Sequence, residues 1–270
     1  MTIPLEDTFA DVIGKAQRGL KLSDDELAER AEIPQSALAK AQGGAFAPLV
    51  VRSLAPVLGL NADALVALGS GTYNPADISL PALELFNTPF GDMTVNSFLV
   101  WDGKEAAAFD TGADATALLD FLKHHGLTLK YLFLTHTHGD HILELDRLVE
   151  KTGASAFVGD REPDLEGAEA FVAGKSFRLG AQTIETRLTW GHAQGGITYV
   201  VHGLEKPLAV VGDAVFAGSM GGGMVSYSAA LRTNRAEIFS LPDETVLACG
   251  HGPLTTVGER KISNPFLAIG

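Results

Sequence analysis

Cysteine and long apolar runs are the two features that this chain lacks most clearly. Cys249 is the only cysteine among 270 residues, so an internal disulfide and a cluster of thiolate metal ligands are both excluded. No apolar run reaches the roughly 20 residues that cross a bilayer. The stretch from Met1 to Asp7 lacks the basic start and apolar core of a signal peptide. We therefore expect a cytoplasmic protein with no membrane partner.

Positive charge is also scarce. The chain has 20 Lys and Arg against 33 Asp and Glu, a net charge of −13, and such a protein repels nucleic acid and anionic membranes. Hydrophobic residues make up 46% and charged residues 20%, which is an ordinary globular composition with enough apolar mass for a substantial core. The length allows one large domain, or a large domain and a small one.

Histidine is concentrated in one short stretch. Residues 135–141 read T-H-T-H-G-D-H. They follow an apolar run at 131–134 that suits a buried strand, and they precede a segment at 142–149 with helical periodicity. Three imidazoles and a carboxylate would each need a polar partner if buried, so they are poor core residues. Because imidazole and carboxylate are ligands of zinc, iron and manganese, the loop predicts a metal site.

Three further metal-capable side chains follow a glycine at the end of an expected strand. They are His192, Asp213 and His251, in loops where the backbone can approach closely. Together with the first motif they would supply two ions with three or four ligands each, one carboxylate being shared. The predicted metal ligands are His136, His138, Asp140, His141, His192, Asp213 and His251.

Strand and helix signals recur in two halves around these motifs. The expected strands lie at residues 94–101, 105–110, 131–134, 154–158, 175–179, 182–188, 198–202, 208–211 and 245–249. Besides the helix that begins at 142, helices are expected at 115–125 and 229–240. This alternation predicts an α/β fold with two sheets that carry helices on their outer faces.

Residues 1–72 are expected to form a small all-α domain, and residues 73–270 the catalytic domain. Ser23 and Glu26 form a capping box that begins a helix. Further helices are expected at 35–42, 50–58 and 62–68, before a linker at 69–71. The segment resembles the five-helix helix-turn-helix domain of phage-repressor-type regulators, through residues 22–31, the turn at 33–34 and residues 54–60.

The segment lacks the charge that DNA binding needs. It holds six Lys and Arg against nine Asp and Glu, and the would-be recognition helix at 35–42 carries only Lys40. Duplex binding requires several side chains that neutralise phosphates. We therefore expect no specific nucleic-acid binding, and we favour packing or homodimer formation as the role of this segment.

The ordered motifs resemble those of the metallo-β-lactamase superfamily, most closely its glyoxalase II-like (hydroxyacylglutathione hydrolase-like) branch of thioester hydrolases. The resemblance spans roughly residues 90–268. It includes residues 96–100 and 109–112 and the T-H-T-H-G-D-H stretch. It also includes three short segments that carry the later ligands: Gly-His at 191–192, Gly-Asp at 212–213 and Gly-His-Gly-Pro at 250–253. It implies that an αββα sandwich follows the helical segment.

The resemblance also implies a cofactor and a reaction. Two divalent metal ions would bind per chain, with zinc expected and iron or manganese as alternatives. The implied reaction is hydrolysis of a small-molecule thioester by a metal-bridging hydroxide, with Asp140 also orienting the nucleophile. His136, His138 and His192 would hold the first ion, Asp140, His141 and His251 the second, and Asp213 would bridge them.

Two other interpretations of the same residues are open. A mononuclear iron persulfide dioxygenase would use His136, His192 and Asp213 and leave the second site empty. A transcriptional regulator with a metal-binding sensor domain would need a basic recognition helix. We expect structural or surface roles for the remaining candidates, which are Asp110, His124, His125, His202 and Cys249.

Overall fold

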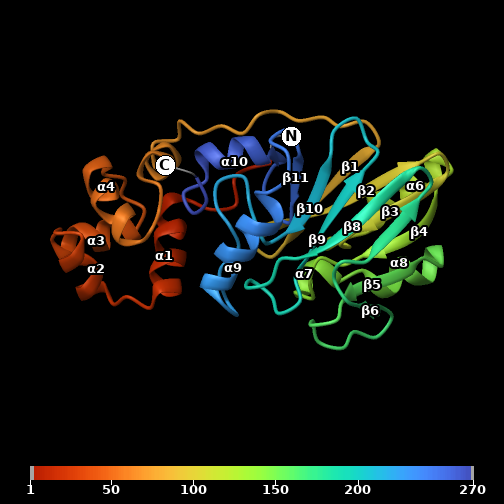
Figure 1. Ribbon diagram of the computed structural model, residues 1–270, viewed down its shortest axis with the longest axis horizontal. Helices are drawn as coiled ribbons and strands as arrows, with labels where there is room; N and C mark the ends of the chain where they lie inside the picture. Colours follow the sequence, from red (N-terminus) through yellow and green to blue (C-terminus); the bar gives the residue numbers. More distant parts are fainter. Residues whose placement is uncertain (1–2, 269–270) are drawn as a thin grey trace.

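The computed structural model describes residues 3–268 and contains two six-stranded sheets that lie face to face (Figure 1). The first sheet comprises β1 (Leu83–Phe90), β2 (Met93–Asp102), β3 (Glu105–Phe109), β4 (Thr128–Phe133), β5 (Ser155–Gly159) and β6 (Glu169–Phe171). The second comprises β7 (Ser176–Leu179), β8 (Gln182–Leu188), β9 (Ile197–His202), β10 (Leu208–Gly212), β11 (Val246–Cys249) and β12 (Thr255–Thr256). The predicted α/β class and two-sheet architecture are confirmed.

Both sheets are mixed. In the first, β1 to β3 pair antiparallel, and β3 to β6 pair parallel. In the second, only β10 and β11 pair parallel. The carboxyl ends of β4, β10 and β11 lead into the predicted metal motifs. The ends of parallel strands meet at one edge of a sheet, so this topology gathers the motifs at one end of the sandwich.

Aromatic side chains fill the space between the sheets. Phe133 of β4 is fully buried, with its ring centroid 4.8 Å from that of Phe177 and 5.0 Å from that of Tyr199 in the opposite sheet. The Tyr199 hydroxyl donates a hydrogen bond of 2.7 Å to the carbonyl of Leu134. A buried phenol needs such a partner, and this one fixes the second sheet to the loop that carries the histidine motif.

Helices cover the outer face of the first sheet, and others pack against the second sheet. α6 (Thr116–His125) and α8 (Leu145–Thr152) bury Leu118, Leu122 and Leu148 against the first sheet. The helix predicted to begin at 142 is instead two pieces, because α7 (Gly139–Ile142) begins inside the histidine motif. The helix predicted at 229–240 is α9 (Tyr227–Thr233) continued by one π-helical segment, η1 (Asn234–Ile238). α10 (Val257–Ser263) follows β12.

Five helices precede the sandwich: α1 (Phe9–Leu20), α2 (Asp24–Arg30), α3 (Gln35–Gln42), α4 (Pro48–Val57) and α5 (Ala62–Gly69). The Ser23 capping box is confirmed. Asn61 caps α5, because its side chain accepts a hydrogen bond from the Ala64 amide. The sequence interpretation placed no helix at α1, although Thr8 and Asp11 form a capping box there. The helix-turn-helix assignment and the boundary at residue 72 stay predictions, as does a homodimer.

The five helices share a hydrophobic core with the outer face of the second sheet. Buried residues of α1, α4 and α5 belong to the same apolar cluster as residues of β10, β11 and α9. A Cβ added at Gly19 would collide with the ring of Tyr227, and the amide of Asn61 donates 2.7 Å to the carbonyl of Pro265. The five helices therefore pack against α9 and α10 at one end of the molecule (Figure 1).

Three strands lie outside the predicted strand positions: β1, β6 and the two-residue β12. A segment without regular structure at residues 70–80 joins α5 to the first sheet. Among residues 3–268, no helix has the length and apolar character needed to cross a bilayer.

Candidate metal centre

Asp110 holds the histidine loop in place. It directly follows β3 and has a left-handed backbone with a φ of 56°. One of its carboxylate oxygens accepts a hydrogen bond of 2.7 Å from the Thr135 amide, and the other accepts one of 2.8 Å from the Thr135 hydroxyl. The predicted structural role of Asp110 next to the site is confirmed. These bonds fix where the loop leaves β4, and so fix the direction of the histidines that follow.

The structure brings all seven predicted ligands together in two groups. Within each group, one potential ligand atom from every residue lies within 4.8 Å of the others. The first group is His136, His138, His192 and Asp213, and the second is Asp140, His141 and His251.

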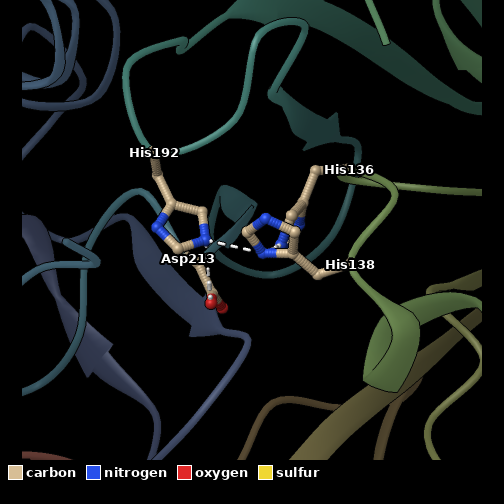
Figure 2. A group of neighbouring side chains, drawn as sticks. All are labelled: His136, His138, His192 and Asp213. Atoms are coloured by element: carbon tan, nitrogen blue, oxygen red, sulfur yellow. Dashed lines mark hydrogen bonds and ion pairs between the residues drawn. The ribbon is translucent and has the colours of Figure 1, made fainter. Parts of the chain in front are cut away.

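In the first group, three imidazole nitrogens converge. The Nδ1 atom of His138 lies 2.9 Å from Nε2 of His136 and 3.0 Å from Nε2 of His192. In Figure 2, His136 and His138 face His192 and Asp213 from the opposite side of the site. A tetrahedral zinc ion bound at about 2.0–2.1 Å would separate its nitrogen ligands by roughly 3.3 Å. The observed spacing is therefore close to that of a metal-binding triad.

The second group is built around His141, which is completely buried. Its Nε2 atom lies 3.5 Å from a carboxylate oxygen of Asp140. The same Asp140 oxygen is 3.3 Å from Nε2 of His251. Two imidazoles and one carboxylate thus point at a common space, which suits a divalent ion of the zinc, iron or manganese type.

Asp213 connects the two groups. Its Oδ2 atom is 3.3 Å from Nε2 of His192, in the first group, and 3.5 Å from Nε2 of His251, in the second. Its Oδ1 atom is 3.3 Å from Nε2 of His141. The residue follows Gly212, where a Cβ would collide with Thr135. The absence of a side chain at Gly212 lets β10 approach the histidine loop closely enough for one carboxylate to reach both groups.

Hydrogen bonds on the far sides of the rings determine which nitrogen faces inward. Four imidazoles donate through Nδ1 to an oxygen outside the ligand set, which turns Nε2 towards the space where a metal would bind. The pairs are His136 to Thr135 Oγ1 (3.0 Å), His141 to Asp110 Oδ2 (2.8 Å), His192 to the Gly222 carbonyl (3.0 Å) and His251 to the Thr94 carbonyl (2.6 Å).

The donor set fits a metal pair on a further observation. The Nε2 atom of His141 and the Oδ1 atom of Asp213 are both buried, and neither has a hydrogen-bond partner among residues 3–268. Buried polar atoms without a partner are costly. A bound cation would satisfy both atoms at once.

The two groups differ in the charge state of their histidines. Burial, reinforced by the charge on His141, lowers the pKa of His136 well below its usual range, and burial also lowers that of His192. Burial opposes a proton on His141, but the carboxylates of Asp110 and Asp213 outweigh it and raise the pKa to about 10. At His251, hydrogen bonds to Asp140 and Asp213 likewise outweigh burial, and they raise the pKa to about 11.

Asp213 stays ionised for the complementary reason. Burial would raise the pKa of its carboxyl, but the neighbouring His141 and His251 hold it well below the ordinary range. At Asp140 burial is outweighed in the same way, since the hydrogen bond from His251 lowers its pKa. Both carboxylates are therefore available as anionic ligands.

The residues set aside in the sequence lie outside the cluster. His202 is exposed and lies 3.2 Å from Glu185, and His124 and His125 are exposed at the end of α6. The thiol of Cys249 is fully buried, and burial raises its pKa to about 12. It is therefore no nucleophile.

One acidic residue at the site escaped the sequence interpretation. A carboxylate oxygen of Glu6 lies 3.9 Å from Nδ1 of His251, and burial raises the pKa of Glu6. No motif surrounds Glu6, and it reaches the site only because the segment before α1 crosses the loop that carries Gly252. That contact depends on packing between distant parts of the chain.

Two facing sheets with a histidine- and aspartate-rich double site at one end define a metallo-hydrolase fold. The family model of the metallo-beta-lactamase superfamily matches residues 90–251, and the chain belongs to this superfamily. The match leaves the five N-terminal helices outside it.

Three similar proteins give the finer context. Hydroxyacylglutathione hydrolase GloC of Haemophilus influenzae is 31% identical over 198 residues, covering 64% of this chain and 92% of the relative. The BLEG-1 B3 metallo-beta-lactamase structure is 28% identical with a TM-score of 0.60, covering 68% of this chain and 99% of that one. The structure of TTHA1623 in a di-iron-bound form is 25% identical with a TM-score of 0.56, covering 67% and 100%.

Proposed function

We propose that this protein is a hydrolase with two divalent metal ions per chain and that it cleaves a thioester. The position of Asp213 carries the proposal, because its carboxylate lies within 3.5 Å of histidines from both ligand groups. A closely spaced metal pair needs a shared anion of this kind to offset the repulsion between the cations. His136, His138 and His192 would hold one ion, and Asp140, His141 and His251 the other.

The residues of the chain divide the work of such a reaction. A bound metal pair supplies a water with a pKa lowered towards about 7 and a Lewis acid for the substrate carbonyl. Asp140 is partly exposed, and its lowered pKa keeps the carboxylate ionised, so it can accept a hydrogen bond from the attacking water and orient it. His192 and His251 are held by the Gly222 and Thr94 carbonyls, which keeps the site ready before substrate binds.

A thioester is the substrate class that we favour. The relative GloC is named a hydroxyacylglutathione hydrolase, and a thiolate leaves without needing a strong general acid. No serine or cysteine nucleophile is required, and the single thiol is buried with its pKa raised to about 12. The ion can be zinc, iron or manganese, and the di-iron form of TTHA1623 makes iron a serious alternative to zinc.

The test combines elemental analysis with a panel of substrates. Protein purified without added metal is analysed for zinc, iron and manganese, and then assayed on acyl thioesters, a cephalosporin and glutathione persulfide. We expect about two ions per chain and turnover of thioesters that stops on chelation. Cephalosporin hydrolysis without thioester hydrolysis would replace the proposed substrate class.

The metal content and the substrate panel also test the dioxygenase alternative, and a gel shift tests the regulator alternative. About one iron per chain, with oxygen uptake on the persulfide, would identify a dioxygenase instead of a hydrolase. A regulator would show tight, sequence-selective duplex binding in a gel shift at physiological salt. We expect no such binding, because Lys40 is the only basic residue of α3.

A further inference from the structure

A basic pocket lies between the first helix and a loop of the catalytic region. It has a volume of about 860 Å³ and contains three cationic side chains but no acidic one, in a chain with a net charge of −13. Its lining includes Lys15, Arg18 and Lys21 from α1 and its end, and Gly222, Met224 and Val225 from the loop before α9.

The three cations are not equivalent. Lys15 is half-buried and already engaged, because its ammonium lies 2.5 Å from the Asp7 carboxylate and 3.0 Å from the Met220 carbonyl. Arg18 and Lys21 are exposed. The ion pairs of the N-terminal helices, as far as the structure describes the chain, involve Lys15, Arg30 and Arg52. Arg18 and Lys21 therefore keep their full charge available to a ligand.

The wall of the pocket is tied directly to the metal centre. The carbonyl of Gly222 accepts the hydrogen bond from Nδ1 of His192. The amides of Val225 and Ser226 donate 3.0 and 2.9 Å to the carbonyl of Gly191, the residue before that histidine. One side of the pocket and the loop that carries a metal ligand thus form one hydrogen-bonded unit.

The edge of the pocket is apolar. The side chains of Met224 and Val225 are 76% and 47% exposed, an unusual exposure for large apolar residues on the wall of a pocket. Two unpaired cations and two exposed apolar side chains in the lining of one pocket suit a molecule that carries both an apolar part and an anion. Guanidinium groups bind carboxylate and phosphate with two parallel hydrogen bonds.

We propose that this pocket binds the carboxylate or phosphate of the thiol half of the substrate, through Arg18 and Lys21, while the thioester carbonyl lies at the metal centre. This inference rests on the proposed thioester hydrolysis. It gives the N-terminal helices, which lie outside the family match, a role in choosing the substrate. The overall negative charge repels anionic substrates, and the two cations reverse that field locally.

The decisive variant removes both free cations, as Arg18→Ala with Lys21→Ala. Its matched control is Arg30→Ala with Lys40→Ala, which removes the same two residue types from α2 and α3, outside the pocket. Each protein is assayed on acyl thioesters of coenzyme A, of glutathione and of N-acetylcysteamine, which presents no anion. All four positions are exposed, so thermal unfolding is expected to confirm an intact fold.

We expect the pocket variant to raise KM for an anionic thioester by at least about tenfold, the loss of a charge-assisted contact, with kcat nearly unchanged. KM for the N-acetylcysteamine thioester stays the same, and the control variant behaves as wild type. An effect confined to coenzyme A identifies a phosphate, and one confined to glutathione identifies a carboxylate. Equal changes in both variants, or no change in either, would overturn the inference.

Calorimetry with the free thiols separates this inference from the proposed function. Coenzyme A and glutathione are titrated into wild-type protein and both variants. Binding that only the pocket variant loses supports the pocket even if no thioester is hydrolysed. Hydrolysis by wild type and by the pocket variant with the same KM leaves the function intact and rejects the pocket.

Discussion

The two ligand groups use the same residue types but hold protons very differently. In the first group, burial lowers the pKa of His136 and His192, so their imidazoles are neutral and ready for a metal at pH 7. In the second, carboxylates outweigh burial and raise the pKa of His141 to about 10 and of His251 to about 11. A metal at the second group must displace protons, whereas one at the first need not.

The contrast follows from where the carboxylates lie. Asp110, Asp140 and Asp213 all contact histidines of the second group, whereas the first group contains three imidazoles and shares only Asp213. The second group therefore has an excess of negative charge that protons satisfy when no metal is present. Its metal occupancy should depend on pH more steeply than that of the first group.

The largest expected effect comes from removing the residue common to both groups. Asp213→Ala deletes the anion that holds two cations together, so kcat for thioester hydrolysis should fall by at least roughly 10²-fold. His202→Ala, which changes an exposed histidine outside the cluster, should alter kcat far less. Both variants are assayed under metal-replete conditions, with circular dichroism to check folding. Near-wild-type turnover by folded Asp213→Ala would show that the carboxylate is not shared.

A ligand from the second group separates the two sites. His251→Ala leaves the first group complete, so the variant should retain about one ion per chain and lose most of its hydrolytic activity. Elemental analysis of this variant after dialysis, beside wild type, gives the stoichiometry. Retention of about two ions would mean that the groups do not correspond to separate sites.

Asp110 is expected to matter through His141. Asp110→Asn keeps the shape of the side chain but removes the charge that accepts the Nδ1 proton of His141 at 2.8 Å. Metal affinity at the second group should fall by about 10–100-fold, and that of the first group should fall less, because Asp110 reaches it only through Thr135. Competition with a chelator, read for each ion, measures both affinities. An equal loss at both sites would point to general damage to the loop.

Much of this site could be read from the sequence, because its ligands are held by short local motifs. Residues 136–141 lie on one loop, and His192, Asp213 and His251 each follow a glycine after a strand. The hydrogen-bond partners Thr94 and Gly222 could not be read in this way. They act through backbone carbonyls, which carry no sequence signature, and they reach the histidines only through tertiary packing.

The same limit explains what was missed elsewhere in the chain. The strand β1 contains Asn87, Thr88 and Pro89 and ends in exposed residues, so its alternation is weak, and pairing with β2 makes it a strand. The helix α1 had a readable cap at Thr8 that was overlooked. Its packing against α9, which creates the basic pocket, depends on contacts more than 200 residues apart, such as that between Lys15 and Met220.

A smaller effect should appear in the stability of metal-free protein. The raised pKa values of His141 and His251 mean that their protonation stabilises the fold fully below about pH 6.5. That contribution is lost as pH rises through about 10 and 11. The melting temperature of chelator-treated protein should therefore fall across this range, and fall less when metal is bound. A flat profile without metal would contradict the assigned charge states.

Titration of metal-free protein with zinc or iron(II) tests the two-metal account most directly. Bound metal and thioester hydrolysis are measured on the same samples at each addition. The account predicts that activity keeps rising until about two ions are bound per chain, with the second ion binding more weakly at lower pH. Full activity at one bound ion, unchanged by the second, would contradict it.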